Sequence, residues 1–128
     1  MGNKFSSVSF NLCNFEKVQN AIKNNDIIIN TLSDNLQNCL ISGTTSITNE
    51  VILLNNCLKN KKNVLIIIYG KNNNDNSVLT KYNQLIGLGF TNVAIYLGGI
   101  FEWLLLQDIY GDDNFSTTCK EIDILKYR

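Results

Sequence analysis

Residues 63–76 read NVLIIIYGKNNNDN, and this stretch decides the fold. The six residues after Asn63 are apolar and largely β-branched, as expected of a strand that is covered on both faces. Residues 70–76 are polar, and their Gly and Asn content favours a loop. The next segment, residues 77–88, is predicted to be a helix that ends at Gly89, because its apolar residues have helical spacing: Val78, Tyr82, Leu85 and Ile86.

The rest of the chain alternates in the same way between predicted strands and predicted helices. Further strands are expected at residues 6–12 (alternating Val8, Phe10 and Leu12), 26–32 and 92–97, and further helices at residues 15–23, 49–60 and 100–110. Asn14 is placed to cap the helix at 15–23. The face of that helix predicted to turn inward carries Val18, Ala21 and Ile22. In the helix at 49–60, the inner face is predicted to carry Val51, Leu54, Cys57 and Leu58. This order predicts an α/β domain over residues 1–128, with a mostly parallel central sheet and helices on both faces.

The composition excludes several kinds of site. The 128 residues carry 11 basic and 11 acidic side chains, which argues against a nucleic-acid partner. The chain has no His, and its single Arg is the last residue, Arg128. A Ser-His-Asp triad, a Cys-His pair, a histidine metal site and an arginine clamp for phosphate are therefore all excluded. No metal or cofactor is expected.

The N-terminus carries a candidate lipidation motif. Residues 1–7, MGNKFSS, fit the myristoylation pattern, with Gly2 as the acceptor and Ser6 as the required hydroxyl residue. No signal peptide or membrane-spanning run is evident. We therefore expect a cytoplasmic protein with a flexible segment at residues 1–7 and a polar tail at residues 112–128. A single acyl chain on Gly2 would attach it only weakly to a membrane.

Three motifs of the second half resemble the rhodanese-like (sulfurtransferase) family. They are residues 64–70 (VLIIIYG), residues 85–93 (LIGLGFTNV) and residues 98–103 (GGIFEW). They match the family's strand before the catalytic Cys, its "L…GF.NV" segment and its "GG…W" segment. The resemblance extends over roughly residues 6–110 and implies a rhodanese-like fold. In the first half, Asn30, Thr31 and Leu32 replace the family's acidic and Arg positions, and residues 39–44 (CLISGT) stand where it has "gHIpGA".

The resemblance places the family's nucleophilic Cys at Gly70. In active members that Cys accepts sulfane sulfur as a persulfide, and backbone N–H groups of the following loop and helix stabilise its thiolate. Gly70 has no side chain to carry sulfur. The resemblance therefore implies the fold, whereas this residue argues against the usual chemistry.

Two features could retain part of the site. The loop could still bind an anion with its N–H groups, and the charge of Lys71 would help. Asp75 would oppose the anion unless its carboxylate caps the helix and turns away. The residues of this loop are Gly70, Lys71, Asn72, Asn73, Asn74, Asp75, Asn76 and Ser77. A plain polar surface loop is the alternative. Cys39 could be a displaced nucleophile, but no neighbour in sequence would lower its pKa, so an inert thiol is favoured over this interpretation.

These observations favour a rhodanese-like binding or scaffolding module without classical thiosulfate sulfurtransferase activity. An active sulfurtransferase that uses Cys39, or a non-covalent binder of small anions, are the alternatives. The cysteines form no C-x-x-C pair, and all four thiols are expected to be free in a reducing compartment: Cys13, Cys39, Cys57 and Cys119. Trp103 is predicted to be core. The consecutive Leu104, Leu105 and Leu106 cannot all face one core, which makes this region a candidate contact for a protein partner.

Overall fold

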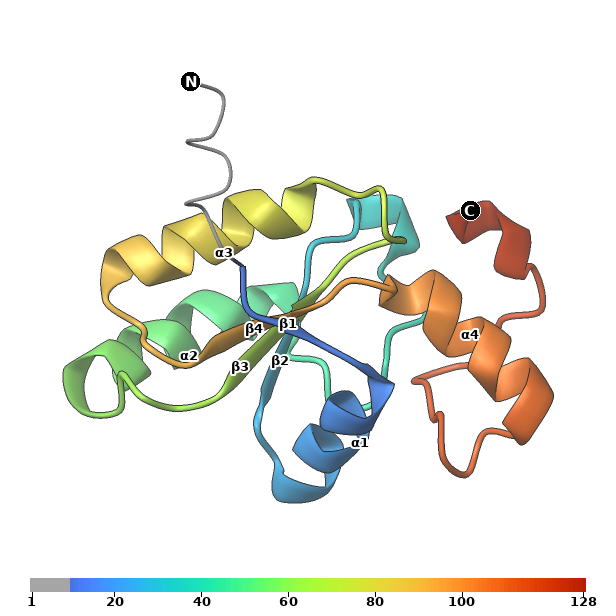
Figure 1. The fold of residues 1–128 in the computed structure, drawn as a ribbon, viewed down its shortest axis with the longest axis horizontal. Coiled ribbons are helices and arrows are strands. Elements are labelled where there is room, and N and C mark those ends of the chain that lie inside the picture. Colours follow the sequence, from blue (N-terminus) through green and yellow to red (C-terminus); the bar gives the residue numbers. More distant parts are fainter. Residues whose placement is uncertain (1–9) are drawn as a thin grey trace.

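A computed structural model describes residues 10–128 (Figure 1). Within these residues, four strands and four α-helices alternate: β1 (Leu12–Cys13), α1 (Phe15–Asn24), β2 (Ile27–Asn30), α2 (Ile47–Asn60), β3 (Ile66–Tyr69), α3 (Ser77–Leu88), β4 (Val93–Tyr96) and α4 (Gly99–Tyr110). The same part of the chain also has short 3₁₀ helices at Asp34–Leu36 and Ile124–Tyr127. The element order is the one that the sequence predicts.

The four strands form one parallel sheet in the order β1-β4-β3-β2. In Figure 1, α2 and α3 lie on one face of the sheet and α1 and α4 lie on the other. Every residue of β2, β3 and β4 is buried, as expected of strands that helices cover on both sides. The prediction of an α/β fold with a parallel sheet and helices on both faces is confirmed.

Alternate strand residues supply two separate cores. One core joins α1 and α4 to the sheet through residues such as Ile28, Ile67 and Tyr69, with Trp103 at its centre. The other core joins α2 and α3 to the sheet through residues such as Ile29, Ile66 and Ile68. The period of two along each strand produces this division.

Local signals at two helix ends are confirmed. The Asn14 side chain accepts a hydrogen bond from the Lys17 N–H (3.2 Å) and so caps α1. Gly89 follows α3 with φ +111, a left-handed conformation that glycine adopts at no steric cost.

In the described part of the chain, the first strand is shifted from its predicted position: strand pairing covers Leu12 and Cys13, which pair with Ile95 and Tyr96 of β4, and does not include residues 10–11. Leu12 lies at the edge of the sheet and is exposed. Residues 6–9 of the predicted strand, including Val8, lie outside the described residues.

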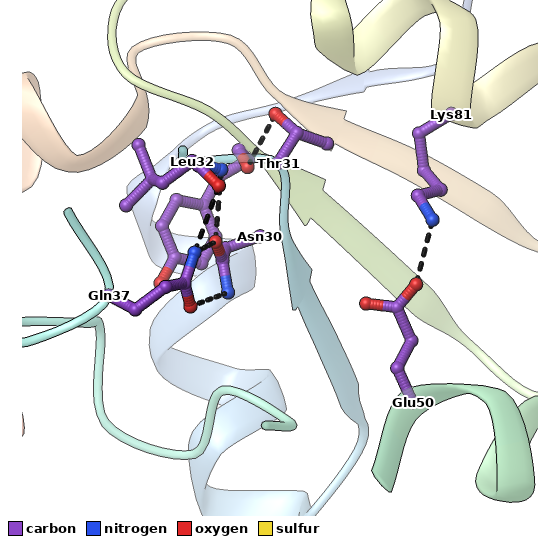
Figure 2. A network of polar contacts seen from close by, with 7 residues as sticks. Asn30, Thr31, Leu32, Gln37, Glu50 and Lys81 are labelled. Atoms are coloured by element: carbon purple, nitrogen blue, oxygen red, sulfur yellow. Dashed lines mark hydrogen bonds and ion pairs between the residues drawn. The ribbon is translucent and has the colours of Figure 1, made fainter. Parts of the chain in front are cut away.

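Two helix faces are also rotated from their predicted positions. Val51 is 63% exposed, because α2 instead turns Glu50, Leu54 and Cys57 inward. Glu50 can take that place because Lys81 of α3 forms an ion pair with it (2.7 Å), as Figure 2 shows. Ile86 is exposed because α3 packs through Val78 and Leu85, about 100° away around the helix.

The C-terminal segment, residues 112–128, packs against the domain. Phe115 and Tyr127 are buried in the core that contains Trp103. The Trp103 indole N–H donates to the Ser116 carbonyl oxygen (3.0 Å), which fixes the segment to α4. The sequence predicts a polar tail here, because Phe115 and Tyr127 are isolated aromatic residues that form no periodic hydrophobic pattern. Among the helices of residues 10–128, none is both long and apolar enough to cross a bilayer.

Candidate functional site

The candidate site lies at the carboxyl ends of β2 and β3, where ligands of parallel α/β sheets usually bind. Gly70 directly follows β3, and residues 70–76 connect it to α3. Thr31, which directly follows β2, binds this end of β3 through its N–H, which donates to the Tyr69 carbonyl oxygen (3.0 Å). The parallel sheet therefore brings the predicted loop and the end of β2 together.

The carboxylate of Asp75 occupies the centre of the loop. Its Oδ2 accepts from the Lys71 N–H (2.8 Å), and its Oδ1 accepts from the Ser77 N–H (3.1 Å) and the Ser77 hydroxyl (2.6 Å). Partial burial opposes the charge of Asp75, but these hydrogen bonds outweigh it and lower the pKa of the carboxyl group. The loop thus presents its N–H groups to an anion, and that anion is its own side chain.

The site has no free space for a side chain at position 70. A Cβ atom there would lie 2.6 Å from Asp75 Oδ2 and 2.9 Å from both Thr31 Oγ1 and Val78 Cγ1. Asp75 therefore caps α3 without turning away from Gly70. Sequence raises the capping role of Asp75, but it does not reveal that the carboxylate fills the space beside Gly70.

The first turn of α4 supports the loop through main-chain hydrogen bonds. The N–H groups of Ile100 and Phe101 donate to the carbonyl oxygens of Gly70 and Lys71, each at 3.0 Å. Gly99 makes this approach possible, because it has φ +66 and a Cβ there would lie 2.5 Å from the Gly70 carbonyl oxygen. The double Gly motif of the sequence is thus a structural support of the site.

A neutral polar network fixes the end of β2 (Figure 2). The side-chain amides of Asn30 and Gln37 bond each other in both directions, at 3.2 and 2.7 Å. Asn30 also accepts from the Leu32 N–H (3.0 Å), and Gln37 also donates to the Leu32 carbonyl oxygen (2.9 Å). An amide pair therefore orders the turn at residues 30–32, which replace the acidic and Arg positions of the family that the sequence resembles.

An open cavity of about 550 Å³ lies beside the loop. Its polar lining includes Thr31, Ser33, Lys71, Asn72, Asn74 and Arg128. The Asn72 amide donates to the Tyr127 carbonyl oxygen (2.8 Å), which brings the C-terminal segment to the loop. Sequence reasoning set Arg128 aside because it is the last residue; the structure places it at this cavity.

The structure gives Cys39 an environment unlike that of a nucleophile. Cys39 is 1% exposed and is not among the residues that line the cavity beside Gly70. Its thiol donates to the Cys119 carbonyl oxygen (3.0 Å). Burial raises the pKa of Cys39 to about 11, so the thiol is protonated at neutral pH.

The other residues that the sequence analysis singled out differ in burial. Trp103 and Leu104 are buried, Leu106 is half-buried, and Leu105 is 40% exposed, so a partner contact at Leu104–Leu106 stays a prediction. Gly2 lies outside the described residues. Within residues 10–128, no group of three or more Cys, Asp or Glu side chains is arranged to hold a metal ion.

The fold and the site together define a parallel α/β domain built around a strand–loop–helix site, and three solved structures share this fold. The yeast Saccharomyces cerevisiae Ygr203w protein, described as a homolog of single-domain rhodanese and the Cdc25 phosphatase catalytic domain, aligns with a TM-score of 0.62 at 12% identity, covering 90% of this chain and 91% of that chain. The Alr3790 protein of Anabaena aligns with a TM-score of 0.59 at 18% identity, covering 89% and 97%. The BH2092 protein of Bacillus halodurans aligns at 0.54 and 22%, covering 80% and 77%.

The family itself is shown by sequence. The model of the family described as Rhodanese-like domain matches residues 14–106, which is more than half of the chain. The chain therefore belongs to the rhodanese-like domain family, as its motifs predict. No curated protein matches its sequence.

Proposed function

We propose that this rhodanese-like domain acts as a binding or scaffolding module and does not carry out thiosulfate sulfur transfer. One observation carries the proposal: the Asp75 carboxylate fills the space beside Gly70, where the family resemblance places the nucleophilic thiol. Sulfur transfer through a persulfide needs a thiolate at that point. Gly70 supplies none.

The electrostatics of the loop support the same proposal. A thiolate or an anionic sulfur donor would need the N–H groups of Lys71 and Ser77, which already bind Asp75. The hydrogen bonds that lower the pKa of Asp75 keep it negatively charged at neutral pH. Its charge would repel thiosulfate, and Lys71 and Arg128 would have to offset that repulsion.

Restoring the thiol tests the proposal. We expect wild-type protein incubated with thiosulfate to gain no sulfur by intact mass and to form no thiocyanate from cyanide. Gly70→Cys alone is expected to gain no sulfur, because its Cβ would lie 2.6 Å from Asp75 Oδ2. Gly70→Cys combined with Asp75→Ser removes that contact, and the two that remain, at 2.9 Å, are with the side-chain ends of Thr31 and Val78, which can shift. The variant keeps a hydroxyl at position 75 to bind the start of α3 and is expected to gain one sulfur atom.

Controls separate the alternatives. Asp75→Ser alone keeps the capping hydroxyl but lacks the new thiol, so it should gain no sulfur. A persulfide on wild-type protein would overturn the proposal, and its loss in Cys39→Ser would establish the alternative enzyme. Near-ultraviolet circular dichroism checks that each variant is folded.

A thiosulfate titration followed by NMR tests the third possibility, a non-covalent binder of small anions. We expect no saturable shifts of the amides at 70–77 in wild-type protein, because Asp75 occupies the cradle. The same titration of Asp75→Ser should produce them. Saturable binding by wild-type protein would favour the anion-binding function over the one proposed here.

We propose in addition that Gly2 is myristoylated and supplies a weak membrane attachment to a cytoplasmic protein. The residues that support this proposal lie outside the described part of the chain. When the protein is produced together with N-myristoyltransferase, wild-type protein should carry the acyl mass and partition into vesicles. Gly2→Ala should do neither, and equal partitioning of the two proteins would contradict the proposal.

A further inference from the structure

Two of the four free cysteines lie opposite each other on paired segments. Ile41 and Thr117 form an antiparallel bridge between residues 39–42 and residues 116–119. The Ser42 N–H donates to the Ser116 carbonyl oxygen (3.0 Å), and the Thr118 N–H donates to the Leu40 carbonyl oxygen (2.8 Å). In an antiparallel register each step along one segment is a step back along the other, so Cys39 lies opposite Cys119.

The register also fixes the kind of pair. The Leu40/Thr118 and Ser42/Ser116 positions carry the main-chain hydrogen bonds. The same register, continued by one residue on each segment, puts Cys39 and Cys119 at the next non-hydrogen-bonded position. Cα atoms at such positions lie about 4.5 Å apart. That separation is within the range that a disulfide spans, about 4.4–6.8 Å.

The side chains agree with this placement. Cys39 already points toward its neighbour, because its thiol donates to the Cys119 carbonyl oxygen (3.0 Å). Cys39 is buried whereas Cys119 is exposed, so one thiol is open to a reagent and the other is held beside it. Cys57 belongs to the core on the opposite face of the sheet, and Cys13 lies in β1.

We infer that Cys39 and Cys119 form a reversible, redox-sensitive disulfide that locks the C-terminal segment onto the domain. With a small disulfide such as oxidised glutathione as the oxidant, the Cys119 thiolate attacks one sulfur and releases one glutathione thiolate. Cys39 then loses its proton and attacks Cys119 Sγ, which releases the second glutathione. The two protein thiols are oxidised, and one glutathione disulfide is reduced to two thiols.

The lock would act on the candidate site. The C-terminal segment ends at the cavity, where Arg128 is part of the lining and the Tyr127 carbonyl oxygen accepts from Asn72. Between Cys119 and that end, Tyr127 is buried in the core. A disulfide at residue 119 would therefore hold in place the end of the C-terminal segment, which lines the cavity through Arg128. The inference does not depend on whether the loop at Gly70 transfers sulfur.

Peptide mapping of the folded full chain after treatment with oxidised glutathione tests this. We expect a single intramolecular link between Cys39 and Cys119, reversed by dithiothreitol. Closure should be faster at higher pH, because the buried Cys39 must lose its proton. Thermal unfolding of the oxidised protein should shift upward by about 5–10 °C, since a disulfide closes a long loop of the unfolded chain.

Matched variants make the outcome decisive. Cys119→Ser, at an exposed position that should leave the fold intact, is expected to abolish both the link and the shift, whereas Cys13→Ser should change neither. Amide hydrogen exchange in residues 112–128 should slow on oxidation of wild-type protein only. A stable mixed disulfide of Cys119 with glutathione, or a link between two chains, would overturn the inference.

Discussion

The loop at residues 70–77 and the paired segments at residues 39–42 and 116–119 place different chemistry at two points of the same domain. At the loop, where the family resemblance places a nucleophilic thiolate, the Asp75 carboxylate lies beside Gly70. At the paired segments, the Cys39 thiol lies against the Cys119 carbonyl oxygen. The comparison teaches that the N–H groups of the loop bind a carboxylate, whereas the thiols of Cys39 and Cys119 lie at a different point of the domain.

The two regions are also stabilised differently. Main-chain contacts from α4 and the charge of Asp75 hold the loop. Side-chain burial at Phe115 and Tyr127, together with main-chain bonds to Leu40 and Ser42, holds the C-terminal segment. We therefore expect substitutions at the loop support to destabilise the whole domain, and substitutions in the segment to loosen the segment first.

Gly99→Ala should have the largest effect and would break the loop side of the comparison. Its Cβ would lie 2.5 Å from the Gly70 carbonyl oxygen in a left-handed conformation, so the loop and α4 must separate. We expect a loss of about 3 kcal/mol or more in the free energy of unfolding, measured with urea. Gly87→Ala is the control, because nothing lies within 4 Å of a Cβ there and Ala favours a helix. A loss of under about 1 kcal/mol in Gly99→Ala would contradict the close approach.

Tyr127→Ala tests the other region. Removing this buried ring should cost about 2–3 kcal/mol, less than a central core position, because the chain end can detach locally. Hydrogen exchange should quicken at the main-chain amides of residues 112–128 and at the side-chain NH2 group of Asn72, which donates to the Tyr127 carbonyl oxygen. Tyr110→Ala removes an exposed ring and should change little. Unchanged exchange at Asn72 would show that the segment does not support the loop.

Asp75→Asn should have a smaller effect, about 1 kcal/mol at neutral pH, through the loss of charge-assisted hydrogen bonds. Since folding lowers the pKa of Asp75, its contribution is full above the pKa of the unfolded chain and is lost as pH falls through the folded pKa. The difference in unfolding free energy between wild type and variant should therefore shrink on acidification. Asp113→Asn, at an exposed position, is the control. A difference that grows at low pH would contradict the assigned charge.

Cys119→Ser should have the smallest effect on the reduced protein, within about 0.5 kcal/mol, because the side chain is exposed. The same variant should lose the whole stabilisation that oxidation gives wild-type protein. Urea unfolding with and without dithiothreitol measures both differences. If oxidation changed the unfolding free energy of variant and wild type equally, the stabilisation would not come from a disulfide between Cys39 and Cys119.

Sequence predicts the fold of this chain well where the signal is local. The apolar runs of β3 and β4, Asn14 and Gly89 act through neighbouring residues, and each has its predicted role. Val51 and Ile86 were misplaced because ion pairing and packing between α2 and α3 choose which side of a helix turns inward.

The candidate site is predictable only in part for the same reason. Gly70 and its loop follow from the strand before them, and the family resemblance marks the position. That the Asp75 carboxylate fills the space beside Gly70 depends on the conformation of the loop, in which it binds the Lys71 and Ser77 N–H groups. The approach of Arg128 and Cys119 to the first half of the chain depends on long-range contacts. No spacing in the sequence encodes those distances.

The central claim is that a carboxylate has replaced the thiolate function of the loop. Intact mass after incubation with thiosulfate, on wild-type protein and on the Gly70→Cys/Asp75→Ser variant side by side, tests it most directly. The account predicts no bound sulfur on wild-type protein and one sulfur atom at position 70 of the variant. Sulfur bound to wild-type protein, or a folded variant that takes up none, would contradict it.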